Sequence, residues 1–210
     1  MSSDIAGIGF IVIQVAALVF SIIVHEVAHG YAAWRLGDPT AHMADRLTLN
    51  PLKHIDPIGS VVLPLILVIS HSPVLFGWAK PVPFNPYYFR DPKKGIMIVG
   101  AAGPGANFVL AIVSAILLRV VAPLGGVVVD FMAIMCITNV FLGVFNLIPI
   151  PPLDGSRVLM GVLPDRWLRP YMQIERYGFI ILFVLLYAGL LDRVVQPVAG
   201  LLFKLLLHGA

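Results

Sequence analysis

The stretch IAGIGFIVIQVAALVFSIIVHEVAHGYAAW, residues 5–34, decides what kind of fold this chain can adopt. A helix needs about 20 consecutive apolar residues to cross the hydrocarbon core of a bilayer, and only Gln14 and Ser21 are clearly polar here before His25. A signal peptide has a basic start and a shorter apolar region, whereas Asp4 is the only charge before this run. The stretch therefore predicts a transmembrane helix.

The whole chain of 210 residues has the same character. Hydrophobic residues make up 59% of it and charged residues 12%, against about 45–50% and about 25% in soluble proteins, and the mean hydropathy is +0.94. This excludes a soluble globule, and a disordered chain would need more charge. The net charge of +3 is too small and too dispersed to favour a nucleic acid partner. The composition predicts a single all-α polytopic domain over residues 1–210, embedded in a lipid bilayer.

Six apolar runs predict about five to six transmembrane helices. The last two runs would be only about 21–22 Å long as helices, which is short for a bilayer. No internal repeat is visible among the runs. They cover residues 5–34, 58–76, 95–121, 127–148, 177–191 and 194–207.

Basic residues are concentrated in three connecting segments, residues 35–57, 77–94 and 149–176. Short loops with an excess of lysine and arginine face the cytoplasm. The N-terminal tail and the turn at residues 122–126 contain no basic residue. This distribution predicts that the three basic segments are cytoplasmic and that the N-terminus lies outside.

A full crossing of residues 58–76 conflicts with this orientation, because the basic segment that follows would then lie outside. Two alternatives remain open. The run can enter the membrane and return on the same side, interrupted by Pro64 and Pro73, where protein or a water-filled cavity satisfies the irregular backbone. Alternatively, the run crosses fully and residues 77–92 return as an extended chain.

The first apolar run contains His25-Glu26-Val27-Ala28-His29 near its inner end. Two histidines four residues apart lie on one helical face, about 40° apart around the axis and about 6 Å along it, so their imidazoles can converge on one zinc ion. Glu26 can reach a metal-bound water as a general base. Three ionisable residues within an apolar helix are costly without a partner. The motif therefore predicts one Zn²⁺ per chain.

A catalytic zinc site needs a third protein ligand and leaves its fourth position to water. Asp154 is the only acidic residue between Asp130 and Asp165, and it follows the fourth apolar run. Prolines at positions 149, 151 and 152 end that helix, and Gly155 allows the chain to turn. If residues 58–76 return on the side they entered, Asp154 and the two histidines lie near the same membrane face.

The motif at residues 25–29 and the segment from Asn146 to Gly155 together resemble the site-2 protease family of intramembrane zinc metalloproteases. The sequence Gly-Pro-Gly-Ala-Asn at residues 103–107 is similar to that family's GPxxN element. The family's common distal motif is Asn-Pro-x-x-Asp-Gly, whereas here Asn146 is followed by Leu-Ile-Pro. This sequence variant also occurs in the family's short prokaryotic branch. The resemblance covers about residues 5–162, and two further helices at about 177–207 follow this catalytic core.

The resemblance implies an intramembrane endopeptidase that cleaves a transmembrane protein substrate. It implies the short prokaryotic form without a PDZ or regulatory domain, placed in the inner cell membrane with its active site toward the cytoplasm. It assigns His25, His29 and Asp154 as zinc ligands and Glu26 as general base. Asn146 occupies the family position that stabilises the oxyanion or holds the substrate strand.

A buried scissile bond also needs water and an unwound substrate, because a helix hides its carbonyl groups in hydrogen bonds. A cavity open to the cytosol would supply the water. A β-like edge strand at residues 77–88 would pair with the substrate backbone. Pro81 and Pro83 favour an edge strand over a central one.

Several other polar residues have both a functional and a structural interpretation. His54 and Asp56 could support the metal site or hold extra metal, or they could form a polar turn in which Asp56 caps the next segment. Asn107 and Asn139 could lie at the site or bond between helices. Arg157 could lie near the site or serve as a cytoplasmic anchor, and the anchor is the preferred interpretation. The remaining residues have structural interpretations. Cys136 is expected in the core, His42 and His71 are expected to be isolated in loops, and Gly100, Gly103 and Gly105 are expected at close helix contacts.

Two other classes of protein compete with a protease. Intramembrane histidine and aspartate also mark ion pathways, so a metal-ion transporter is one alternative. It would need ionisable groups across the bilayer, yet the first run offers only Gln14 and Ser21 above His25. A catalytically inactive binding protein is the other alternative, and the intact Glu26 argues against it. No feature of the sequence sets the oligomeric state.

Overall fold

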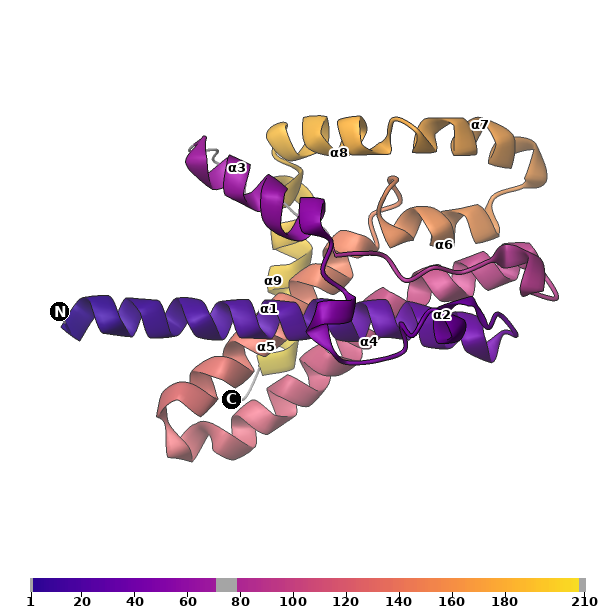
Figure 1. Ribbon diagram of the computed structural model, residues 1–210. Helices are drawn as coiled ribbons and strands as arrows, with labels where there is room; N and C mark the ends of the chain where they lie inside the picture. The colour runs from indigo at the N-terminus through magenta and orange to yellow at the C-terminus, as the bar shows by residue number, and fades with distance from the viewer. Residues whose placement is uncertain (1, 71–78, 208–210) are drawn as a thin grey trace.

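The computed structural model describes residues 2–70 and 79–207, and every regular element in these ranges is helical (Figure 1). Three long helices form the centre of the molecule: α1 (Ser2–Arg35), α4 (Pro92–Val121) and α5 (Gly126–Asn146). Each contains a segment long and apolar enough to cross a membrane. The helices predicted from the first, third and fourth apolar runs are therefore confirmed.

The three long helices pack against one another through small side chains. α4 contacts both α1 and α5, and α1 also contacts α5. Ala17, Ala111 and Cys136 are completely buried at these contacts, whereas Val12 and Val120 are mostly exposed. Lipid-embedded helices pack in this way, since small residues let the backbones approach and apolar side chains can face the lipid.

The described residues contain fewer candidate spans than the five to six predicted. Three helices qualify alone, and a fourth span exists only if α8 (Gly178–Tyr187) is joined to Leu191–Leu207 across a bend of 74°. The latter segment comprises the π-helical turn η5 (Leu191–Val195) and α9 (Gln196–Leu207). The 10 residues of α8 are about 15 Å long, half of a hydrocarbon core. The last two apolar runs therefore make at most one span between them.

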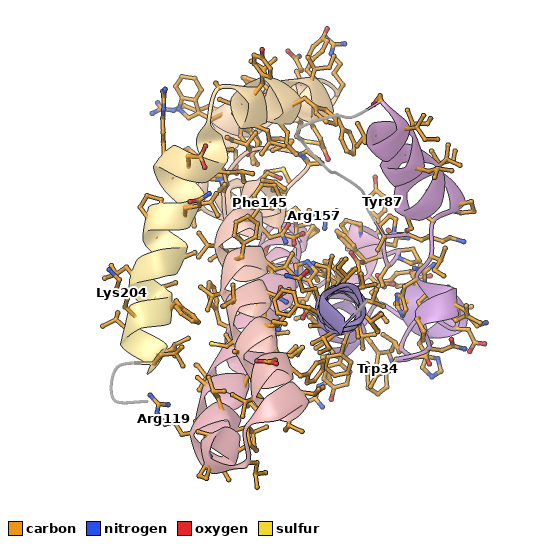
Figure 2. The ribbon with its side chains drawn as sticks, turned by 90° about the vertical axis from the view of Figure 1, so that its left-hand side faces the viewer. Trp34, Tyr87, Arg119, Phe145, Arg157 and Lys204 are labelled. Atoms are coloured by element: carbon orange, nitrogen blue, oxygen red, sulfur yellow. The ribbon has the colours of Figure 1, made fainter. Side chains whose placement is uncertain are left out.

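The second apolar run is described by the structure only up to residue 70, and that part is helical. It contains the π-helical turn η2 (Pro57–Val62) and α3 (Leu63–Ile69). Viewed along α1, α3 and α9 lie on opposite sides of that helix (Figure 2). The carboxylate of Asp56 caps η2 by accepting hydrogen bonds from the amides of Ile58 and Gly59. The capping interpretation of Asp56 is confirmed.

The chain returns after α3 to the place where the second run began. The amide of Lys80 donates a hydrogen bond to the carbonyl of His54 at 2.9 Å. Arg46 strengthens this junction, because its Nη2 donates to the carbonyl of Lys80. Residues 55–79 therefore start and finish at one point of the fold, which agrees with the alternative in which this run turns back.

Besides η2 and α3, the described part of the connection from residue 36 to residue 91 contains three short helical turns and an extended stretch. The turns are α2 (Thr40–Met43), η1 (Pro51–Lys53) and η3 (Pro86–Tyr88). No β-strand occurs in residues 2–70 and 79–207, so the strand predicted at 77–88 is not formed over 79–88, and residues 77–78 lie outside the described ranges. Pro81, Pro83 and Pro86 in this stretch lack the amides that a strand ladder uses.

The segment after α5 reverses the chain and leads into α6 (Asp154–Val162), which packs against α4. A Cβ atom at Gly155 would lie 2.2 Å from the carbonyl oxygen of Leu147, so the reversal requires glycine, as the sequence predicted. α7 (Asp165–Glu175) and α8 then follow each other along one side of the molecule (Figure 1).

Candidate metal centre

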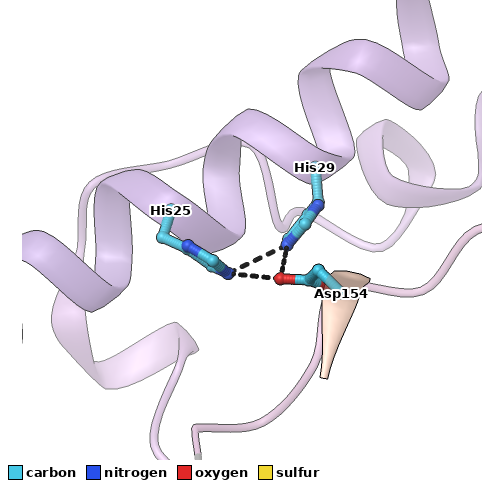
Figure 3. Close-up of side chains that lie close together, drawn as sticks. All are labelled: His25, His29 and Asp154. Carbon is cyan, nitrogen blue, oxygen red and sulfur yellow. Dashed lines mark hydrogen bonds and ion pairs between the residues drawn. The ribbon is translucent and has the colours of Figure 1, made fainter. Parts of the chain in front are cut away.

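Two histidines of α1 and the first residue of α6 converge on one point. The Nε2 atoms of His25 and His29 are 3.0 Å apart, and they lie 3.0 Å and 3.1 Å from Oδ2 of Asp154 (Figure 3). All three residues are buried. Among the described residues, they are the one group of histidine, cysteine or acidic side chains close enough together to hold a metal ion. The structure thus brings together the three residues that the resemblance assigned as ligands.

A backbone carbonyl sets the protonation of His29. Its Nδ1 lies 2.6 Å from the carbonyl oxygen of Val99 on α4. A carbonyl oxygen can only accept a hydrogen bond, so Nδ1 carries the proton. In the neutral imidazole, Nε2 then presents a lone pair toward His25 and Asp154, which is the form that binds a metal.

A buried series of hydrogen bonds through two asparagine side chains sets which nitrogen of His25 is protonated. The series begins at the carbonyl of Met135, which accepts a hydrogen bond of 2.8 Å from Nδ2 of Asn139. Oδ1 of Asn139 therefore faces Asn107 and accepts from its Nδ2 at 2.8 Å. This leaves Oδ1 of Asn107 to accept from Nδ1 of His25 at 2.6 Å. Nε2 of His25 consequently also presents a lone pair.

Ser21 closes this series on α1. Its hydroxyl accepts a hydrogen bond from Nδ2 of Asn139 at 2.8 Å and donates to the carbonyl of Ala17 at 2.7 Å. Ser21, Asn107 and Asn139 are all 0% exposed. Every link joins a donor to an acceptor, so the series holds the imidazole of His25 in a single orientation.

The three converging atoms fit a divalent cation. Ligand atoms of a tetrahedral zinc site lie about 3.3 Å apart, close to the separations observed here. Two lone pairs and a carboxylate oxygen repel one another unless a cation lies among them, and a proton can satisfy only one pair at a time. Metal binding requires the ionised carboxylate of Asp154 together with the neutral form of both imidazoles.

Two glycines of α4 make room for the cluster. A Cβ atom at Gly103 would lie 2.4 Å from Nε2 of His29 and 2.7 Å from Cε1 of His25. A Cβ atom at Gly100 would lie 2.7 Å from Cβ of Arg157 on α6. The prediction of close contact is confirmed at both positions. It is wrong for Gly105, which has no atom within 4 Å of such a Cβ.

Gly103→Ala is expected to displace the imidazoles and weaken zinc binding by at least about tenfold, the size of effect seen when groups that orient a ligand are lost. Chelator competition measures the affinity. Gly105→Ala is the matched control, because the same methyl group enters the same helix two residues away in open space. Equal affinities for the two variants would contradict the steric role of Gly103.

A cavity of about 400 Å³ lies beside the three ligands. Glu26 and Asn146 both line it. Oε2 of Glu26 accepts a hydrogen bond of 3.0 Å from the amide of Val82, and Nδ2 of Asn146 donates to the carbonyl of Leu142 at 3.1 Å. The other lining residues include part of the extended 79–85 stretch, Arg157 of α6, and Phe179 and Leu182 of α8.

The sequence of this chain is similar to those of bacterial metalloproteases. It is 38% identical over 191 residues to the Bacillus subtilis (strain 168) protein named "Putative zinc metalloprotease YwhC", with 87% of this chain and 84% of the relative covered. A family model described as peptidase family M50 matches residues 119–189. The chain belongs to peptidase family M50. The site-2 protease resemblance read from the motifs is thereby confirmed, and this M50 chain is a member of a family of zinc metalloproteases.

Other relatives of this M50 chain carry similar names. The protein named "Putative zinc metalloprotease Rip2" of Mycolicibacterium smegmatis is 33% identical over 187 residues, with 89% of this chain and 71% of the relative covered. The Mycobacterium tuberculosis (strain H37Rv) protein of the same name is 29% identical over 192 residues, with 90% and 71% covered. No solved structure matches the chain.

The other polar residues differ in their position relative to the M50 site. Asn107 lies at the site against His25 and also bonds between helices to Asn139, whereas Asn139 lies behind Asn107 and is absent from the cavity lining. Arg157 lines the cavity and contacts Asp154, so of its two interpretations the position near the site is confirmed. The sequence signal that could have placed it is its position three residues after Asp154 on a helix, one turn further along the same side.

His54 lies outside the metal cluster. Its Nε2 donates to the carbonyl of Thr48 at 2.8 Å and its own carbonyl holds Lys80, so it organises the loop. His42 stacks on Trp34 at a ring distance of 6.0 Å, and His71 lies outside the described residues.

Proposed function

We propose that this chain is a zinc-dependent intramembrane endopeptidase that hydrolyses peptide bonds within or near transmembrane segments. The observation that carries the proposal is the placement of Glu26 in one cavity with His25, His29 and Asp154. This cavity lies among helices that are apolar enough to reside in a membrane. One zinc ion per chain follows from the single cluster of three ligands found among the described residues.

Zn²⁺ held by His25, His29 and Asp154 would supply Lewis-acid polarisation and lower the pKa of water at the site toward about 7. Glu26 accepts the proton from the attacking water and passes it to the leaving amine. The amide of Val82 holds one carboxylate oxygen of Glu26, so the other oxygen is available for proton transfer. Asn146 lines the same cavity and is the proposed group for the oxyanion or the substrate backbone.

The extended 79–85 stretch is the proposed contact for the substrate backbone. Ala79, Pro81 and Val82 line the cavity, and the stretch has no strand partner within the described residues. A transmembrane helix must unwind before cleavage, and pairing with an extended chain stabilises the unwound form. The occupant is a transmembrane protein substrate within the lipid bilayer.

The cytoplasmic side of a prokaryotic inner membrane is the proposed location of the site. The two histidines lie in the last third of α1, near Arg35, and the basic segments adjoin this end. The junction of His54 with Lys80 supports a second run that enters and leaves the membrane on that side.

Purified chain reconstituted in vesicles tests the function. We expect one zinc ion per chain by elemental analysis, and cleavage of a single-span substrate at a bond that mass spectrometry locates within or near the span. Zinc uptake into the vesicles without cleavage would instead show a metal-ion transporter. Stoichiometric zinc without either activity, across a panel of single-span substrates, would show an inactive binding protein.

A further inference from the structure

Arg157 contacts both the metal cluster and the extended 79–85 stretch. On α6, its Nη1 donates a hydrogen bond to Oδ1 of Asp154 at 3.1 Å. Its guanidinium carbon lies 5.4 Å from the centre of the Phe84 ring, on the extended 79–85 stretch. Its side chain is 33% exposed, and it lies near the middle of the molecule when viewed along α1 (Figure 2).

The first contact divides the two oxygens of Asp154 between different partners. Oδ2 lies at the point where His25 and His29 converge, and Oδ1 is taken by Arg157. A charge-assisted hydrogen bond of this kind is stronger than one between neutral groups. It keeps Oδ1 turned away from the metal position, so that Asp154 binds through a single oxygen and a coordination position stays open for water.

The second contact steadies the stretch that carries the partner of Glu26. A guanidinium over an aromatic face attracts the ring, and the Phe84 ring also stacks on Phe89 at 6.2 Å. Phe84 is two residues from Val82, whose amide binds Glu26. The attraction of Phe84 to Arg157 therefore limits movement of the backbone that orients the catalytic carboxylate.

The backbone beneath Arg157 is well fixed. α6 rests on α4 where Gly100 leaves space, since a Cβ atom at Gly100 would lie 2.7 Å from Cβ of Arg157 and 3.1 Å from the carbonyl of Asp154. The guanidinium therefore extends over the cavity from a rigid base. A residue that only anchored the protein to lipid headgroups would not need two partners at the site.

We propose that Arg157 is a positioning residue that holds Asp154 as a one-oxygen metal ligand and holds the 79–85 stretch in place through Phe84. The inference rests on the proposed function, because the metal site and the stretch belong to that mechanism. It assigns to one side chain both the geometry of the ligand set and the alignment of the general base.

The proposal that Arg157 keeps Asp154 as a one-oxygen ligand is tested by metal binding, without any protease assay. Co²⁺ replaces zinc in purified chain, since its visible absorption is strong in four-coordinate sites and weaker in five-coordinate ones. Arg157→Met should weaken the absorption, because Oδ1 becomes free to bind, and should lower zinc affinity about tenfold. Arg157→Lys should restore the spectrum, since an ammonium can also bind Oδ1.

Arg166→Met is the matched control, because it makes the same substitution on exposed α7 away from the cavity. Its spectrum and zinc affinity should equal those of the wild type. An unchanged spectrum in Arg157→Met overturns the proposal, whatever the affinity, and so does an equal change in the control. A wild-type chain that binds cobalt but cleaves no substrate would refute the proposed function while leaving this test intact.

The proposal that Arg157 holds the 79–85 stretch through Phe84 is tested with Phe84→Leu, which removes the ring and leaves Asp154 and Arg157 in place. The cobalt spectrum should be unchanged, and kcat/KM for a transmembrane substrate should fall about two- to fivefold, as loss of a cation–π contact implies. An unchanged kcat/KM would remove Phe84 from the proposal. A changed spectrum would contradict the separation of the two contacts.

Discussion

Glu26→Gln is expected to lower the cleavage rate of a transmembrane substrate by about 10²–10⁴-fold, the contribution of a positioned general base, with zinc content unchanged at the wild-type level. The amide oxygen of glutamine can still accept the hydrogen bond from Val82, which the structure gives to Oε2 of Glu26. The side chain thus keeps its size and its partner but can no longer take a proton. Single-turnover cleavage and elemental analysis on the same preparation measure both results.

Glu175→Gln is the matched control for this substitution. Glu175 ends the exposed helix α7 and is absent from the cavity lining, so its loss should leave cleavage within about twofold of the wild type. Full cleavage by Glu26→Gln would refute the assignment of Glu26 as general base. Loss of zinc from Glu26→Gln would mean that Glu26 also holds the metal site together.

The histidine pair was predictable from the sequence because local helix geometry decides it. Residues four apart on a helix share a face, and α1 is long and uninterrupted. Asp154 lies 125 positions from His29, and its assignment required the family resemblance together with the inferred topology. The structure agrees with both arguments, since His25, His29 and Asp154 meet at 3.0–3.1 Å.

The residues that orient the ligands were harder to predict. The Val99 contact involves a backbone carbonyl, which has no sequence signature. Asn139 could have lined the cavity or bonded between helices, and it instead bonds to Asn107 from behind. For Arg157 the sequence left two interpretations open, a position near the site and a cytoplasmic anchor. Its true position depends on how closely α6 approaches α4, which Gly100 permits.

The membrane spans show the limit of counting apolar runs. Hydropathy identifies apolar stretches but gives neither their direction nor their breaks. The 74° bend between α8 and Leu191–Leu207 converts two predicted spans into one at most. The prolines of the 79–85 stretch had favoured an edge strand, yet the same missing amides leave it as an extended chain without a ladder.

Asp154→Ala is expected to abolish both stoichiometric zinc binding and cleavage. The loss of affinity should exceed the roughly 10–100-fold cost of losing a group that only orients a ligand, because His25 and His29 then remain as the only two ligands of the cluster. Asp165→Ala is the matched control, since that carboxylate is exposed and pairs with Lys93 at the surface, where an ion pair contributes little. Elemental analysis and chelator competition measure zinc, and circular dichroism shows whether each variant keeps its helices. A folded Asp154→Ala chain with one zinc ion bound would remove Asp154 from the ligand set and leave the site without its third protein ligand.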